Sequence, residues 1–302
     1  MNRLLPAVLP LCLLTACTDI RTRLSPDLLA ADADAQWHFA AHTIQQDRII
    51  SADAPAPLLF PDALQNEAGA EISAGHLSML AVSRDACEAL PELLQAGLLA
   101  PTCLVLYVPD DACGMLANGE LPSAAMLRTA SDTGQIPLRT ADTVTGDLFS
   151  LSGITAVPCP HDGGFTLLLR DSETEYGTLS ASACRGLALL GRNRKSFSFA
   201  AGETACSVTR TNLHLRAEKA AGRLRFTLSG SLQIKPACEQ AEAVLQDMLT
   251  EALTETARNH GADLLFLQEI VLRDHVPEAR SCSRSEWRDM LMQAEYNVQI
   301  SA

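Results

Sequence analysis

The sequence predicts a multidomain, mixed fold in which one or more N-terminal α/β domains precede a C-terminal α+β domain with an antiparallel sheet and a long helix. Two patterns indicate this fold class. One is a strand-helix-strand pattern between residues 75 and 108, and the other is a hairpin followed by a long amphipathic helix after residue 203. With 302 residues, the chain is long enough for two domains that each bury a core.

The composition excludes one class of partner. Hydrophobic residues make up 47% of the chain, as in ordinary folded proteins. Asp and Glu outnumber Lys and Arg by 36 to 23, which gives a formal net charge of −13. Because nucleic-acid binding relies on basic side chains that neutralise phosphates, we expect no nucleic-acid partner.

Residues 1–16 are predicted to be a lipoprotein signal peptide. Arg3 supplies a positive charge, and the apolar run of residues 4–14 is too short for a bilayer-spanning helix. Pro6 and Pro10 also interrupt it.

The apolar run ends in the bacterial lipobox pattern, Leu14, Thr15, Ala16 and then Cys17. In this pattern the small residues enter a signal-peptidase cleft, and the cysteine thiol takes a diacylglyceryl group. Cys17 is therefore the predicted lipid attachment site and the first residue of a mature chain held outside the cytoplasmic membrane by its acyl chains. An ordinary cleaved secretory signal and a short uncleaved anchor are the alternatives.

Eight cysteines stay in the predicted mature body, because Cys12 leaves with the signal and Cys17 is acylated. They contain no C-x-x-C pair and fit no zinc-site spacing, so we expect no metal. Export permits disulfides, but buried, inert thiols suit the same pattern. The eight are Cys87, Cys103, Cys113, Cys159, Cys184, Cys206, Cys238 and Cys282.

The first elements of the body form a β-α-β pattern. Residues 75–83 are a strand-like apolar run, residues 84–99 have helical spacing, and residues 103–108 form a second strand. Asp110 and Asp111 suit the cap of a short helix.

A second group of elements precedes a break in composition. Leu121-Pro122-Ser123 opens a helix whose expected apolar side carries Ala125, Met126 and Leu127. Two strands, 165–170 and 176–179, flank a polar turn, and a helix over 180–190 ends at Gly191. Because residues 192–195 are strongly polar and basic, we place the domain boundary there, between an N-terminal region 17–195, with room for two subdomains, and a C-terminal domain 203–302.

The C-terminal domain is predicted to begin with a hairpin. Leu213 and Leu215 alternate with polar residues, residues 218–222 turn the chain, and alternation resumes at Leu224, Phe226 and Leu228. A long helix over 237–259 follows and ends at His260-Gly261. Its acidic residues are expected to face solvent, and these are Glu239, Glu242, Asp247, Glu251 and Glu255.

Three shorter elements complete the chain. Asp263 is expected to cap a helix through Leu267, and Ser283-x-x-Glu286 is a capping box for a helix that carries Trp287 and Leu291. A short strand is predicted over 296–300.

No motif in the chain specifies catalysis or a cofactor. His161-Asp162-Gly163-Gly164 is typical of a tight turn before a strand. Trp37-His38 and His42 suit one face of a helix or loop, but no H-E-x-x-H pattern is present. Walker A, G-x-S-x-G, S-x-x-K and G-x-G-x-x-G motifs are all missing, so we expect a protein that is not an enzyme.

The order of these elements, taken with the lipobox, resembles the Ger(x)C family, the C-subunit lipoproteins of spore-germination nutrient receptors. Cys17, Asp19 and Leu24 fit the opening segment of that family, although Thr18 and Arg23 replace an expected tryptophan and glutamate. The C-terminal match follows the order hairpin, long helix, Ala262-Asp263, Arg273, Pro277, Trp287 and terminal strand.

This resemblance implies a noncatalytic lipoprotein on the outer face of the inner spore membrane. It would act with an A-type and a B-type membrane subunit in the response to germinants, and Cys17 would carry the lipid. The main alternative is an extracytoplasmic solute-binding lipoprotein of a transporter. An exported hydrolase is a third possibility, which the missing nucleophile motifs disfavour.

Overall fold

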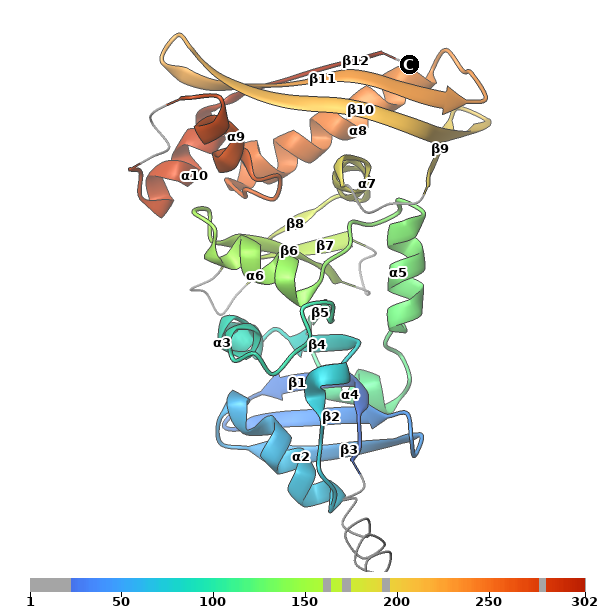
Figure 1. Cartoon of the computed structure of the whole chain (residues 1–302), viewed down its shortest axis with the longest axis vertical. Helices are drawn as coiled ribbons and strands as arrows, with labels where there is room; N and C mark the ends of the chain where they lie inside the picture. The colour runs from blue at the N-terminus through green and yellow to red at the C-terminus, as the bar shows by residue number, and fades with distance from the viewer. Residues whose placement is uncertain (1–22, 160–163, 170–174, 192–195, 277–280, 302) are drawn as a thin grey trace, which may run out of the picture.

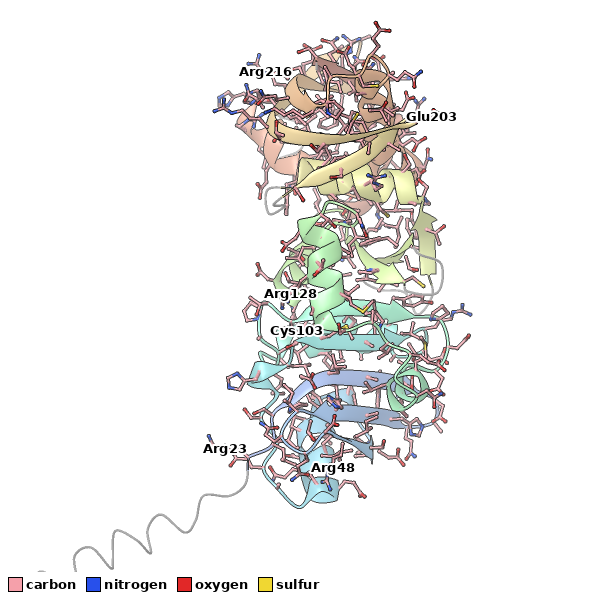
Figure 2. The ribbon with its side chains drawn as sticks, turned by 90° about the vertical axis from the view of Figure 1, so that its right-hand side faces the viewer. Arg23, Arg48, Cys103, Arg128, Glu203 and Arg216 are labelled. Carbon is pink, nitrogen blue, oxygen red and sulfur yellow. The ribbon has the colours of Figure 1, made fainter. Side chains whose placement is uncertain are left out.

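The computed structural model describes residues 23–159, 164–169, 175–191, 196–276 and 281–301. Three sheets follow one another along the long axis of the molecule, as Figure 1 shows. A five-stranded sheet lies nearest the N-terminus, a three-stranded sheet lies in the middle, and a four-stranded sheet lies at the C-terminal end. In the side view of Figure 2, Arg23 and Arg216 lie near opposite ends of this stack. Within the described residues, no helix has the length and apolar character needed to cross a bilayer.

The first sheet has the strand order β3-β2-β1-β4-β5. Its first three strands are β1 (Pro26–Ala33), β2 (Trp37–Thr43) and β3 (Arg48–Ala54), and they form an antiparallel meander. Strands β4 (Met79–Ser83) and β5 (Leu104–Val108) extend the sheet in parallel. The predicted β-α-β unit is confirmed, but the meander before it carried too weak an alternation of polar and apolar residues to be predicted.

Helices cover both faces of this sheet. Leu80 and Val82 of β4 pack into one core with α2 (Phe60–Ala68) and α3 (Leu90–Gln95). Met79 and Ala81 of the same strand pack into the other with α4 (Ala112–Ala117). Because both faces are buried, β4 and β5 are continuous apolar runs. Short 3₁₀ turns span Pro57–Leu59, Ala74–His76 and Cys87–Ala89.

Two boundaries in this region differ from the sequence prediction. The strand predicted from residue 75 begins at Met79, because Ala74–His76 forms a 3₁₀ turn. The helix predicted over residues 84–99 is shorter, since a 3₁₀ turn precedes Pro91, which stands at a helix start. Asp111 caps α4 as predicted, accepting a hydrogen bond from the Gly114 N–H at 2.6 Å.

The middle layer is the antiparallel sheet β6-β7-β8. It consists of β6 (Ile154–Cys159), β7 (Gly164–Leu169) and β8 (Glu175–Leu179), and is followed by α7 (Ala181–Leu190). Two helices come before it, α5 (Ala124–Asp132) and α6 (Ala141–Phe149). The helix predicted to open at Leu121-Pro122-Ser123 is confirmed, with Ser123 as its cap. Ala125 and Met126 are exposed, Met126 to 65%, so their predicted place on the apolar side is wrong.

The last layer has the order β12-β11-β10-β9. Strands β9 (Phe197–Ala201), β10 (Thr204–Ala220) and β11 (Arg223–Lys235) are antiparallel, and β12 (Glu295–Ser301) adds a parallel edge strand. The hairpin turn is confined to Ala221 and Gly222, whose φ angles are 50° and 83°. Two residues with positive φ form the tight turn that suits the twist of a hairpin, and so the strands run further than predicted.

In the described residues after this hairpin, the chain forms four helical segments. They are α8 (Ala241–Leu253), a π-helix (Thr254–Asn259), α9 (Leu267–Arg273) and α10 (Arg284–Gln293). The long helix begins four residues later than predicted. Its end cap at Gly261 and the capping box of Ser283 and Glu286 are confirmed.

Candidate functional site

The predicted lipid attachment site lies outside the described residues, as do Leu14, Thr15 and Ala16. The described chain starts at Arg23, and the Leu24 side chain is already buried in the first core. The Leu24 N–H donates to the Glu71 carbonyl, and the Leu24 carbonyl accepts from the Ser73 N–H, both at 2.9 Å. The chain is therefore fixed to the first domain immediately after the predicted anchor region.

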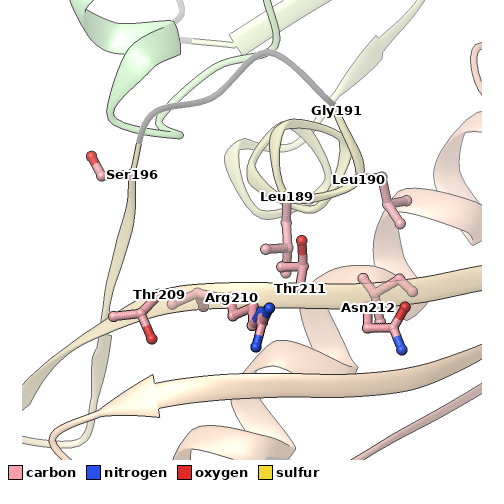
Figure 3. Close-up of a pocket in the computed structure, with 10 residues that line it drawn as sticks. Leu189, Leu190, Gly191, Ser196, Thr209, Arg210, Thr211 and Asn212 are labelled. Atoms are coloured by element: carbon pink, nitrogen blue, oxygen red, sulfur yellow. The ribbon is translucent and has the colours of Figure 1, made fainter.

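The four-stranded sheet and α7 enclose a groove of about 440 Å³. Figure 3 shows α7 end-on above β10, with Leu189 and Leu190 on the helix side and the residues Thr209 to Asn212 on the strand side. The groove thus combines aliphatic side chains from the helix with hydroxyl, amide and guanidinium groups from the strand.

A β-bulge shapes the strand side of this groove. The register of β10 against β11 shifts between Val208 and Arg210, and the Thr209 hydroxyl donates to the Gln233 carbonyl at 3.1 Å. The extra residue changes which positions face the core, so Val208 before the bulge and Leu213 after it pack into the same core. The core residues of β10 are even-numbered before the bulge (Cys206 and Val208) and odd-numbered after it (Leu213 and Leu215). This change of parity in the sequence is the signal that could have predicted the bulge.

A larger cleft of about 1270 Å³ continues from the groove and shares Leu190, Gly191 and Leu213 with it. It extends to the segment before α6, to the loop that precedes α9, and to α9 itself. Its walls combine aliphatic side chains with polar and charged ones, among them charged groups of β10 and α9. The lining residues used below are Leu138, Arg216, Leu265, Phe266, Arg273 and Asp274.

Phe266 is the most unusual residue of this cleft. Its side chain is 50% exposed, and its backbone has φ 56° and ψ 41°, the left-handed region that bulky residues rarely adopt. Asp263 holds the backbone here, because its carboxylate accepts from the N–H groups of Leu267 and Gln268 at 2.5 and 3.0 Å. Strained residues of this kind cluster at ligand and partner sites.

Arg273 and Asp274 dock α9 on the hairpin beside the cleft. The Arg273 guanidinium donates to the Leu215 carbonyl at 2.7 Å and to Asp274 Oδ1 at 2.8 Å. This ion pair holds the pKa of Asp274 below its ordinary value. Asp274 in turn accepts from the Ala217 N–H at 2.8 Å. Arg273, one of the residues that carried the family resemblance, thus has a structural role.

The histidines and acids that could suggest chemistry lie elsewhere. His38 and His42 are on one face of β2, so their predicted place on a helix or loop is wrong. His38 contacts Asp53 at 2.7 Å and Asp34 at 3.1 Å, and His42 contacts Asp27 at 2.6 Å. These hydrogen bonds raise the pKa of both histidines.

No metal-binding group is evident in the part of the chain that the structure describes: it contains no cluster of three His, Cys, Asp or Glu side chains suited to a metal. The predicted turn at His161-Asp162-Gly163 lies outside this part.

Of the acidic residues predicted to face solvent on the long helix, Glu255 instead accepts a hydrogen bond from the Ser180 N–H at 2.7 Å. Burial raises the pKa of Cys103 and of Cys184 to about 12, as expected for unreactive thiols.

The comparisons with known proteins identify one similar fold. No protein-family model and no curated protein sequence matches the chain. The crystal structure of the GerBC protein is similar, with a TM-score of 0.53 and 12% sequence identity, over 90% of this chain and 95% of that chain. The expected Ger(x)C-like, multidomain mixed fold is therefore confirmed.

Proposed function

We propose that this chain is the noncatalytic C-type lipoprotein subunit of a nutrient germinant receptor, required for spore germination. The observation that carries this proposal is the similarity to GerBC along nearly the whole of both chains. A likeness over 90% of this chain supports a shared architecture more strongly than a match to a single common domain would. The lipobox-like sequence at Leu14 to Cys17 supports the same function independently.

Cys17 is the proposed attachment point of the lipid, and the inner spore membrane is the proposed location. Acyl chains on Cys17 would hold the body at the membrane, since each buried methylene contributes about 0.8 kcal/mol. The described chain begins at the end of the molecule opposite the four-stranded sheet (Figure 1). That sheet and its cleft would accordingly lie on the side away from the anchor.

The proposed partners are the A-type and B-type membrane subunits of the receptor. The cleft border around Phe266 is the surface that best suits such a contact, because Phe266 is an exposed aromatic residue in a cleft that Arg216 and Arg273 also line, and aromatic and arginine side chains are enriched among the anchors of protein interfaces. The chain would contribute binding and positioning to the complex.

A solute-binding lipoprotein is the second candidate, and the cleft itself favours it. A volume of about 1270 Å³ exceeds what a small solute needs. The two functions differ in what they predict for the isolated body: a solute carrier binds its ligand unaided, whereas a receptor subunit assembles with membrane proteins.

Co-purification from spore membranes tests the proposal. A tagged wild-type chain is compared with Cys17→Ala, and Cys12→Ala is the matched control because it changes a leader cysteine outside the lipobox. We expect A-type and B-type subunits to be recovered with wild type and Cys12→Ala, and much less with Cys17→Ala. Recovery of transporter subunits, or of no membrane partner with any form, would refute the receptor role.

A further inference from the structure

Two cysteines far apart in the sequence meet at one end of the four-stranded sheet. Cys206 lies on β10, opposite Phe199 of β9, and Cys238 lies in the connection between β11 and α8. Cys206 belongs to the core that this sheet forms with α8, and Cys238 packs against the same core. Cys206 Sγ also lies 3.8 Å from the Pro236 carbonyl, and Cys238 Sγ lies 4.0 Å from the Ala201 carbonyl.

The two thiols differ in access to solvent. Cys206 is buried, with 2% of its surface exposed, whereas Cys238 is half-buried at the edge of the same core. A soluble reagent therefore meets Cys238 first, and Cys206 is the cysteine buried in the core against which Cys238 packs. By contrast, Cys103 and Cys184 are buried in two different cores, one in the first sheet layer and one in the middle layer.

We propose that Cys206 and Cys238 form a disulfide in the exported protein. The oxidant is a small-molecule or protein disulfide, written RSSR. The Cys238 thiolate attacks RSSR, which gives a Cys238 mixed disulfide and releases one RS⁻. The Cys206 thiolate then attacks Cys238 Sγ, forms the Cys206–Cys238 bond and releases the second RS⁻. The two thiol protons end on the two RSH molecules, so two cysteines are oxidised and one RSSR is reduced.

This bond would close a loop that contains the whole β10–β11 hairpin. It would tie the β9–β10 end of the sheet to the segment that enters α8, next to the bulge that shapes the groove. A crosslink across such a loop stabilises a protein largely by restricting its unfolded chain. The proposed location outside the cytoplasmic membrane, on which the inference rests, is the kind of compartment in which such bonds persist.

The first test uses the purified full-length protein and does not depend on where the protein resides. Reduced protein is equilibrated with oxidised glutathione, denatured in acid, alkylated with iodoacetamide and mapped by mass spectrometry. We expect two fewer alkylated cysteines and a peptide pair that joins Cys206 to Cys238. Cys238→Ser should leave Cys206 as an alkylated thiol. Full alkylation of both residues, or glutathione retained on Cys238, would overturn the proposal.

Thermal unfolding provides a second readout. Reductant should lower the Tm of oxidised wild type by about 2–6 °C and leave the Tm of the Cys206→Ser, Cys238→Ser double variant unchanged. An equal response of both proteins to reductant would contradict the inference.

Acid trapping of thiols in spore membranes then tests the bond in the cell. The crosslinked peptide pair is expected there, and a reduced pair would overturn the proposal for the exported protein. The co-purification experiment reads out the receptor role separately. A chain that forms the bond with glutathione but recovers no membrane partner would therefore contradict the proposed function alone.

Discussion

The indole Nε1–H of Trp287 donates a hydrogen bond of 3.2 Å to the Asp263 carboxylate, and both side chains are buried. Asp263 also accepts the Leu267 and Gln268 N–H groups that begin α9. One carboxylate therefore joins α9 to α10 and supports the strained backbone of Phe266, which directly precedes α9. Ala262-Asp263 and Trp287 were among the residues that suggested the family, and the structure gives a physical reason for their pairing.

Asp263→Asn should reduce the free energy of unfolding by about 1–3 kcal/mol near pH 7. An asparagine amide would direct its NH₂ group at one of the three N–H donors and leave that donor unsatisfied in the core. Urea unfolding measures the loss. Trp287→Phe removes one donor from the same carboxylate and should also destabilise the protein. A loss of less than about 0.5 kcal/mol in both variants, the size expected for a surface substitution, would contradict this account.

The pH dependence of the free energy of unfolding of wild type and of Asp263→Asn gives a further check. Burial raises the pKa of Asp263 to about 6, above its value of about 3.9 in an unfolded chain. The folded state therefore binds more protons than the unfolded state between these values, and this contribution to stability is present below pH 4 and is lost as the pH rises through 6. Asp263→Asn should lack this decrease, so the difference in stability between wild type and variant should change across pH 4–6.

Gly186→Ala should separate α7 from α8. A Cβ at Gly186 would lie 2.7 Å from the Ala252 Cβ and closer still to the Met248 carbonyl. Since neither the backbone nor a methyl group can move aside easily, we expect a loss of about 1–3 kcal/mol by urea unfolding.

Gly146→Ala is the matched control, because Gly146 is an exposed residue of α6 whose Cβ would meet nothing within 4 Å. There the substitution should stabilise the protein by about 0.5–1 kcal/mol through helix propensity. Stabilisation by both substitutions would show that α7 and α8 are not in close contact.

The sequence predicted most elements of the C-terminal domain, because there the helix stripe, the capping box and the alternation along the hairpin are local signals. Leu245, Leu249 and Trp287 are buried as their spacing indicates. The meander β1–β3 was missed, since its strands carry too weak an alternation of polar and apolar residues to signal a sheet. The cleft was also missed: Leu138, Leu213 and Leu265 come from three separate segments, and only the tertiary fold brings them together.

Arg139→Met should destabilise the protein by about 3–5 kcal/mol. Arg139 forms a buried ion pair with Asp147, and the Thr155 hydroxyl donates to the same carboxylate at 3.1 Å. Removing the guanidinium would leave the Asp147 charge buried without its cation. The double variant Arg139→Met, Asp147→Leu removes both charges and should lose less stability than Arg139→Met alone. Additive losses in this double-mutant cycle would count against a coupled pair.

The two histidines of β2 should make stability decrease as the pH rises above 6.5. Hydrogen bonds to Asp53 and Asp27 raise the pKa of His38 and His42, so the folded state favours their protonated forms. Their contribution is fully present below the ordinary value of 6.5 and is lost as the pH rises through the raised pKa values. In thermal unfolding, the Tm of wild type and the Tm of the His38→Gln, His42→Gln double variant should become equal at pH values above this range. A constant difference in Tm at every pH would contradict the prediction.

Phe266→Gly should stabilise the chain while weakening its assembly with membrane partners. Glycine adopts the left-handed backbone of this position without strain, and the ring it replaces is half exposed, so we expect a gain of about 0.5–1 kcal/mol despite the greater freedom of the unfolded chain. Met126→Gly is the control, because Met126 is an exposed apolar residue within α5, where glycine should cost about 1 kcal/mol. In the co-purification experiment, Phe266→Gly should recover less of the receptor subunits and Met126→Gly the wild-type amount. A Phe266→Gly chain that is more stable and still recovers its partners in full would place the contact surface elsewhere on the molecule.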